Sequence, residues 1–362
     1  MRVGLIAPPW VPVPPVAYGG IERMVDVLAR GLQRAGVSVT LFATGDSTCP
    51  VPRKYIYEDS STLRMGHQVA AIDHSLAAYE NIGDVDIIHD HTNVGPFVSY
   101  QQTEIPVVAT NHGVFQADTM RRFEAFSKRG IPILAISYDQ ASHASTGINI
   151  ARVIHHGVDT ARIPFGPGGG GYLACLGRMV PEKGIHNACE IARKAGVPLR
   201  IAAKMRDPHE YEYFKAEVEP LLGGDIEYLG ELGTKDKFDL LYRSEALLNP
   251  IEWAEPFGLV MLEALASGNP VIAPPIGATT EIVEDGTTGF LCRTHDDFVK
   301  AISNIDQIDR GECRLQAETT FSMDKMIEDH IAFYNCILRQ RGEVIDLETP
   351  TQIDLNAAVQ LT

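Results

Sequence analysis

Closely spaced cysteines are missing from this sequence of 362 residues. Its six cysteines lie far apart without a CxxC pair, so they indicate neither a zinc site nor a disulfide framework and fit a reducing compartment. No stretch reaches the about 18 uninterrupted apolar residues of a membrane span. The early apolar stretch Val3–Ala17 contains five prolines and lacks both a preceding basic region and a small-residue cleavage site. We therefore expect a cytoplasmic protein without a transmembrane segment. Contact with a membrane surface has no support in the sequence.

Positive charge is also scarce, because 31 Lys and Arg stand against 47 Asp and Glu, a net charge of −16. This balance argues against a protein that grips nucleic acid over a broad surface. Hydrophobic residues make up an ordinary 45% of the chain. The length is roughly twice the about 150 residues of one domain, which predicts two domains.

Short apolar runs alternate with longer helical patterns, and this alternation is typical of α/β domains with parallel sheets. In the helical pattern 21–34, the apolar residues Met24, Val25, Leu28 and Leu32 follow helical spacing, and Gly36 ends the run. The first half thus predicts strands at 3–7, 39–43, 87–89, 107–110 and 134–136. The second half predicts strands at 172–176, 199–203, 226–229, 246–249 and 271–273, with helices at 185–195, 211–219, 235–243 and 259–266.

Two doubly wound, Rossmann-like domains follow from this pattern, and the cleft between them is the expected ligand site. Residues 164–171, with two prolines and five glycines, predict the linker. We therefore expect an N-terminal domain at 1–163, a C-terminal domain at 172–322, an amphipathic helix at 323–342 that crosses back to the first domain, and a polar tail at 343–362.

A glycine pair, Gly19-Gly20, precedes the first helix. Backbone N–H groups at a helix start attract phosphate, although paired glycines before a helix are more often only a turn. No G-x-G-x-x-G occurs there, which argues against a nicotinamide dinucleotide.

The next candidate site is the loop between the strand predicted at 172–176 and the helix predicted at 185–195, which carries two cations. Arg178 follows a predicted strand, and Lys183 precedes the helix at 185–195. A diphosphate would be held by both, since Arg binds in a bidentate manner and Lys acts as a point charge. The alternative interpretation is a solvated pair on a surface loop.

The segment 249–271 is the most informative. Glu255 lies in a loop after a strand, Phe257, Gly258 and Leu259 begin a helix, and Glu263 follows inside that helix. Helix N–H groups favour phosphate and carboxylates accept hydrogen bonds from hydroxyls, so a nucleotide sugar would satisfy both.

Together these segments resemble the family 4 retaining glycosyltransferases of GT-B fold, through Gly19-Gly20, Arg178 with Lys183, and Glu255-x7-Glu263. The likeness extends to about residue 340. It implies that Arg178 and Lys183 bind the donor diphosphate and that Gly20 supports it from the first domain. It further implies that Glu255 binds the transferred sugar near the N–H groups of Phe257, Gly258 and Leu259. Glu263 would bind the ribose, and His112 would reach the sugar beside its anomeric carbon.

The resemblance also implies transfer of a hexose or related sugar to an unidentified hydroxyl, without a metal or other cofactor. In a front-side displacement the departing phosphate oxygen takes the acceptor's proton, so stabilising the diphosphate is the main task. No DxD-type carboxylate pair ends a predicted strand. A GT-B sugar phosphorylase, a nucleotide-sugar epimerase and a non-catalytic sugar-binding protein remain the alternatives.

Several residues have simpler interpretations. His89-Asp90-His91 is expected to be a polar cleft wall rather than a metal site, because no third ligand is in view. Without the resemblance, His112 would be a structural histidine. His155 and His156 are expected to pack or hydrogen-bond between domains, and His156 replaces an Asn usual in the family. Ala278 stands where the family often has a second glycine and is expected to narrow the cleft. The basic residues Arg121, Arg122, Lys128 and Arg129 predict a solvated helix face, with binding of an acceptor phosphate or an anionic lipid as the alternative.

Overall fold

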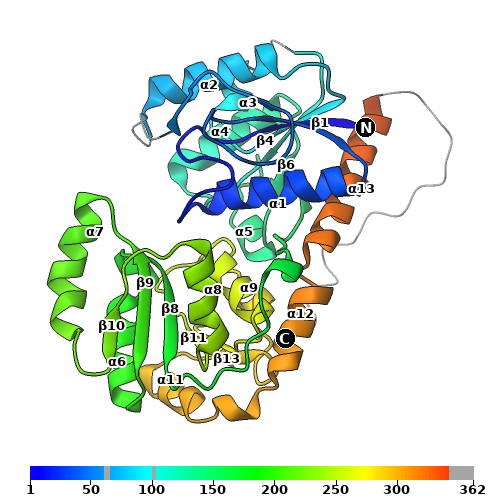
Figure 1. Ribbon diagram of the computed structural model, residues 1–362. Helices are drawn as coiled ribbons and strands as arrows, with labels where there is room; N and C mark the ends of the chain where they lie inside the picture. Colours follow the sequence, from blue (N-terminus) through cyan, green and yellow to red (C-terminus); the bar gives the residue numbers. More distant parts are fainter. Residues whose placement is uncertain (61–65, 100–102, 342–362) are drawn as a thin grey trace.

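The computed structural model describes residues 1–60, 66–99 and 103–341. Two α/β domains lie one above the other, each built around a parallel sheet (Figure 1). The predicted tail at 343–362 lies outside the described residues.

The N-terminal domain contains a seven-stranded sheet in the order β3-β2-β1-β4-β5-β6-β7. Its central strands are almost entirely buried, because helices cover both faces of a doubly wound sheet and leave the middle no contact with water. The strands are β1 (Arg2–Ile6), β2 (Ser38–Phe42), β3 (Arg53–Lys54), β4 (Ile87–Asp90), β5 (Val107–Thr110), β6 (Ile133–Ala135) and β7 (Ile150–Val153).

The helices of this domain are α1 (Gly20–Arg34), α2 (Gln68–Asn81), α3 (Gly95–Ser99), α4 (Ala117–Lys128) and α5 (Tyr138–Ser142). In α1 the side chains of Met24, Val25, Leu28 and Leu32 are buried, which confirms the predicted apolar face. The helix gives way to Gly36, whose φ of 82° is the left-handed backbone that glycine adopts without strain.

The C-terminal domain contains a six-stranded parallel sheet in the order β10-β9-β8-β11-β12-β13. The strand order reverses beside β8, and this reversal opens a crevice at the carboxyl ends of the strands. The strands are β8 (Leu173–Arg178), β9 (Leu199–Lys204), β10 (Ile226–Tyr228), β11 (Leu247–Leu248), β12 (Val271–Ala273) and β13 (Gly289–Leu291). The helices are α6 (Ile185–Ala195), α7 (Pro208–Tyr213) with a π turn at 214–218, α8 (Thr234–Arg243), α9 (Leu259–Ala266), α10 (Thr279–Ile282), α11 (His295–Ile302) and α12 (Arg310–Thr319).

The chain crosses between the domains twice, and the two crossing segments are joined by backbone hydrogen bonds. The N–H of Val158 donates to the carbonyl of Phe321 at 2.9 Å, and the N–H of Met323 donates to the carbonyl of Val158 at 2.9 Å. Residues 164–171, predicted as the linker, lie along the C-terminal domain, where the N–H of Gly166 donates to Ser267 O at 2.9 Å. Glycine is required at 166 because a Cβ there would overlap the backbone of Tyr242.

After the second passage, α13 (Met323–Arg341) lies beside α1 of the N-terminal domain (Figure 1). Its side chains Met326, Ile327 and Tyr334 belong to the same buried cluster as the apolar face of α1. The two helices approach closely at Gly31, where a Cβ would overlap the side chain of Ile327. The last helix thus contributes to the core of the first domain.

Candidate active site

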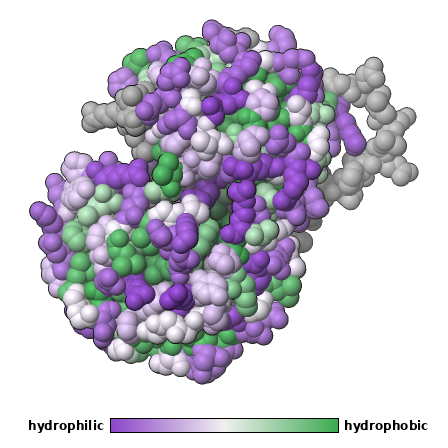
Figure 2. All heavy atoms as spheres, in the orientation of Figure 1, coloured by the Kyte–Doolittle hydropathy of each residue, from purple (hydrophilic) through white to green (hydrophobic). Residues whose placement is uncertain are grey.

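A cleft of about 410 Å³ separates the two domains and is lined by both. Figure 2 shows it as a hollow between the two halves of the molecule. Ten residues predicted from the sequence meet on its walls: His112, Arg178, Lys183, Glu255, Gly19, Gly20, Phe257, Gly258, Leu259 and Glu263. Their individual roles remain predictions.

The upper wall includes the glycine pair at the start of α1. A Cβ on Gly19 would lie 2.8 Å from Pro15 Cβ, so this position has no room for a side chain. Gly20 is different, because a Cβ there would meet no atom within 4 Å. The missing side chain leaves the first turn of α1 open to a ligand, and the N–H groups of that turn favour an anion.

Lys183 and Glu255 form a buried ion pair on the opposite wall. A 3₁₀ turn at Pro181–Lys183 places the lysine, and Gly184 then adopts a left-handed φ of 59° to begin α6. Lys183 Nζ donates to Glu255 Oε1, and the two side chains are only 10% and 11% exposed. The second oxygen, Oε2, has no partner among the described residues. An unpaired buried carboxylate oxygen is a ready acceptor for a ligand hydroxyl.

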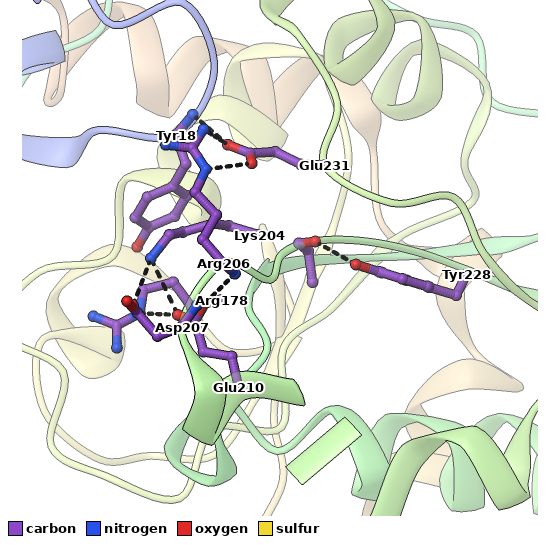
Figure 3. A network of polar contacts seen from close by, with 9 residues as sticks. Tyr18, Arg178, Lys204, Arg206, Asp207, Glu210, Tyr228 and Glu231 are labelled. Atoms are coloured by element: carbon purple, nitrogen blue, oxygen red, sulfur yellow. Dashed lines mark hydrogen bonds and ion pairs between the residues drawn. The ribbon is translucent and has the colours of Figure 1, made fainter. Parts of the chain in front are cut away.

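Arg178 ends β8 and remains 45% exposed. Its Nε lies 3.4 Å from Glu210 Oε1, and that carboxylate also contacts Lys204 Nζ at 3.2 Å. Lys204 is the register partner of Arg178 on β9, so both cations leave the sheet at neighbouring strand ends. Burial opposes the charge of Glu210, but the N–H groups of Arg206 and Asp207, with Lys204, hold the pKa of this carboxyl below its ordinary value. Figure 3 shows this polar network.

Phe257, Gly258 and Leu259 form the tight start of α9, and Gly258 adopts a φ of 100° that favours glycine. The helix brings Glu263 to the cleft, where Lys237 Nζ from α8 donates to Glu263 Oε1. Arg23 of α1 lies 4.0 Å from the same oxygen. Two cations from different domains therefore contact the same carboxylate.

His112 follows β5 and contacts other histidines. Its Nε2 lies 2.9 Å from His91 Nδ1, and its ring stacks on that of His156 with centroids 5.3 Å apart. The rings of His156 and Phe257 lie roughly perpendicular to each other, with centroids 5.0 Å apart. Burial lowers the pKa of His112 to about 3, so at neutral pH it is uncharged and can exchange only hydrogen bonds with a ligand.

The expectation that His89, Asp90 and His91 form a polar wall of the cleft was wrong, because none of the three lines it and all are buried. His89 bonds Thr110 Oγ1 at 2.7 Å and the Tyr334 hydroxyl at 2.6 Å. Asp90 Oδ2 accepts from the Tyr79 hydroxyl at 3.0 Å. Across residues 1–60, 66–99 and 103–341, no three His, Cys, Asp or Glu side chains are grouped to hold a metal ion.

His155 joins the domains, because its Nε2 lies 2.7 Å from Glu281 Oε2 on α10.

The expectation that Ala278 narrows the cleft was wrong. Its methyl is fully buried in the core of the C-terminal domain, outside the lining of the cleft, because its backbone N–H is held by Glu255 O at 3.0 Å. Of the four basic residues, Arg122 lies 3.8 Å from Asp118, and Arg129 covers the Phe97 ring. None of the four lines the cleft.

Sequence reasoning missed three cations of the cleft: Arg23, Lys204 and Lys237. Lys204 stands one residue after a predicted strand, so its place at a strand's carboxyl end was a usable signal. Arg23 and Lys237 carry no motif, and their shared partner Glu263 is distant in sequence.

Comparison with known proteins agrees with this geometry. The family model for Glycosyltransferase Family 4 matches residues 18–162, and that for Glycosyl transferases group 1 matches residues 162–313. The chain belongs to the family 4 glycosyltransferases. This glycosyltransferase has the GT-B arrangement of two parallel-sheet domains. No helix within the described part of the chain is long and apolar enough to span a membrane.

Among its curated relatives is a glycogen synthase of Mycobacterium tuberculosis, 27% identical over 78% of this chain and 81% of the relative. A phosphatidyl-myo-inositol mannosyltransferase of Mycolicibacterium smegmatis is 26% identical over 82% of each chain. Sucrose-phosphate synthase from Thermosynechococcus elongatus shares the fold with a TM-score of 0.76 at 18% identity, covering 93% of this chain and 98% of that one. Anabaena HepE, solved with UDP and glucose, has a TM-score of 0.74 at 18% identity over 93% of this chain and 100% of its own.

Proposed function

We propose that this glycosyltransferase uses a nucleoside-diphosphate sugar and transfers its sugar, with retained configuration and without a metal, to a hydroxyl acceptor. One observation carries the proposal: the open helix start at Gly20 faces a wall bearing Arg178 and Lys183 across a single cleft. Fixed cations and helix N–H groups bind a diphosphate, because both donate hydrogen bonds to its charged oxygens. A fold relative solved with UDP-glucose supports this class of donor.

The two carboxylates suit the remaining parts of such a donor. The free Oε2 of Glu255 would accept a hydrogen bond from a hydroxyl of the transferred sugar, and Glu263 would accept from the ribose. Lys183 and Lys237 each hold one oxygen of these carboxylates and so fix their orientation. The names of the two bacterial relatives, a glycogen synthase and a mannosyltransferase, favour a hexose.

In the proposed reaction, the bond between the anomeric carbon and the phosphate oxygen breaks. The acceptor oxygen bonds to the anomeric carbon on the same face, and its proton moves to the departing phosphate oxygen. Arg178 and Lys183 stabilise the negative charge that grows on the diphosphate. His112, being uncharged, would contribute a hydrogen bond beside the sugar.

The test is a panel of nucleotide sugars screened for thermal stabilisation and for release of nucleoside diphosphate, each with and without a chelator. We expect one donor class to stabilise the protein and to turn over equally in both conditions. Lys183→Ala should weaken the stabilisation by the donor and lower turnover at least tenfold. Lys194→Ala, which changes an exposed lysine on α6 that pairs with Asp296, should do neither. Loss of turnover with the chelator would contradict metal independence.

The same assay separates the alternatives. Donor release that requires inorganic phosphate would identify a phosphorylase, and isomerisation of the donor without an acceptor would identify an epimerase. Stabilisation without turnover, for any acceptor hydroxyl supplied, would indicate a sugar-binding protein. Each of these results would replace the proposed transfer.

A further inference from the structure

Tyr18 reaches across the cleft from the N-terminal domain. It lies in the loop before α1, and its backbone N–H donates to Glu231 Oε1 of the C-terminal domain at 3.0 Å. Glu231 is itself held by Arg206 through two contacts, Nη2 to Oε1 at 2.7 Å and Nε to Oε2 at 2.9 Å. This ion-paired carboxylate anchors the Tyr18 loop against the opposite domain.

The anchored loop directs the Tyr18 ring into the polar network. Figure 3 shows the phenol end of Tyr18 directed toward the group that contains Arg178, Lys204 and Glu210. Tyr18 also lines the cleft together with Lys183 and Glu255. The residue as a whole is 37% exposed and lines the cleft, so a ligand that enters the cleft can reach it.

The surroundings determine which form the phenol takes. Burial raises the pKa of Tyr18 above its ordinary value. The positive charges of Lys183 and Arg178 oppose this rise, and the negative charges of Glu255 and Glu210 add to it. The hydroxyl therefore keeps its proton at neutral pH and can donate a hydrogen bond. A neutral donor placed among cations suits an anionic oxygen.

We infer that Tyr18 is a further catalytic residue, whose hydroxyl donates a hydrogen bond to a diphosphate oxygen of the donor from the side facing Arg178 and Lys183. The inference rests on the proposed function, because it assigns the diphosphate to this wall. No proton is transferred by Tyr18. The hydrogen bond strengthens as the bond to the anomeric carbon breaks and charge grows on the leaving diphosphate. Glu231 is the positioning residue that holds the loop.

The first experiment replaces Tyr18 by Phe, which keeps the ring and removes the hydroxyl. We expect kcat to fall about tenfold or more, the donor KM to change less than about threefold, and the inhibition constant of the nucleoside diphosphate to rise, because the product carries more charge than the donor. Tyr211→Phe is the matched control, since Tyr211 is an exposed tyrosine of α7 outside the cleft. It should behave as the wild type.

Two results would overturn the inference. If Tyr18→Phe turns over like the wild type, the hydroxyl does not contact the diphosphate. If Tyr18→Phe or Tyr18→Ala binds nucleoside diphosphate more tightly, the ring is a plug that the donor displaces. Absence of turnover by the wild type with every donor would instead refute the proposed function, so the two failures are distinguishable.

The positioning role of Glu231 has its own readout. Glu231→Gln keeps an oxygen that can accept from the Tyr18 N–H, whereas Glu231→Ala does not. We expect Glu231→Ala to lower kcat and Glu231→Gln to recover part of the loss. In the Tyr18→Phe background, Glu231→Ala should lower kcat only slightly further, because the hydroxyl that Glu231 positions is already absent. Fully additive losses in kcat would show that Glu231 acts elsewhere in the structure.

Discussion

Lys183 and Glu255 neutralise each other in the cleft, with the lysine Nζ donating to one carboxylate oxygen while the other oxygen has no partner in the described structure. The pair joins the loop after β8 to the loop after β11. A diphosphate would give Lys183 a second anionic partner, and a sugar hydroxyl would give the free oxygen its donor. The two groups proposed to bind adjacent parts of one ligand are thus already held side by side.

Removing Lys183 should therefore damage both function and folding. We expect Lys183→Ala to lower turnover and nucleoside diphosphate affinity at least tenfold, since a charge-assisted hydrogen bond contributes about 1.5–3 kcal/mol. Stability should fall by about 3–5 kcal/mol, because the change leaves the buried Glu255 carboxylate unpaired. Steady-state kinetics, calorimetric titration and urea unfolding measure the three effects. Unchanged diphosphate affinity would remove Lys183 from the site.

Glu255→Gln should show a different pattern. The amide keeps an oxygen and the shape of the side chain, but the sugar loses its charged acceptor. We expect turnover to fall by more than tenfold while affinity for the bare nucleoside diphosphate changes little, about threefold at most. A parallel loss of both quantities would place Glu255 at the diphosphate instead.

Gly31 tests the packing of the last helix on the first domain. We expect Gly31→Ala to destabilise the protein by about 1–3 kcal/mol despite the higher helix propensity of Ala, because the added methyl overlaps Ile327. Ile327→Ala removes the overlapping atoms, so the double variant should lose less stability than the two single losses added together. Urea unfolding of the four proteins measures this coupling. Simple additivity would mean that α1 and α13 do not meet there.

Acidification should destabilise the fold. Burial lowers the pKa of His112 to about 3 and the pKa of His74 and His330 to about 4. It also holds the pKa of three further histidines well below the ordinary value: His89, His91 and His156. Histidines in the unfolded chain gain protons below about pH 6.5, whereas the folded ones do not. Their stabilising contribution is therefore complete above that pH and is lost as the pH falls toward the folded values, by at most about 1.4 kcal/mol per pH unit for each histidine.

Two carboxyls act in the opposite direction. Burial raises the pKa of Glu22 to about 7 and of Asp90 to about 6, so these groups favour folding as the pH falls. Six histidines against two carboxyls predict a net loss of stability between pH 7 and pH 5, measurable by urea unfolding. His330→Asn should make the loss less steep, and His209→Asn, at a highly exposed histidine, should not. A stability that rises on acidification would contradict the prediction.

Local apolar patterns predicted the bounds of helices and strands correctly where the element is buried on one continuous face. The helices predicted at 185–195 and 259–266 match α6 and α9, and the strand predicted at 271–273 matches β12. The predicted helix at 211–219 fails as a single α-helix, because the chain changes from α7 to a π turn at Phe214. The strand β7 was not predicted, because it is an edge strand with partly exposed side chains and no apolar run.

The sequence by itself determined the class of fold and ten of the residues that line the cleft, because apolar periodicity and the spacing of glycines, cations and carboxylates within a segment are local properties of the chain. Tertiary structure alone decided that Arg23 and Lys237 share Glu263, that Tyr18 crosses to Glu231, and that Gly31 meets Ile327 of the last helix. These contacts join residues far apart in the chain. Their energies depend on burial and distance in space, and no local pattern of residues encodes either.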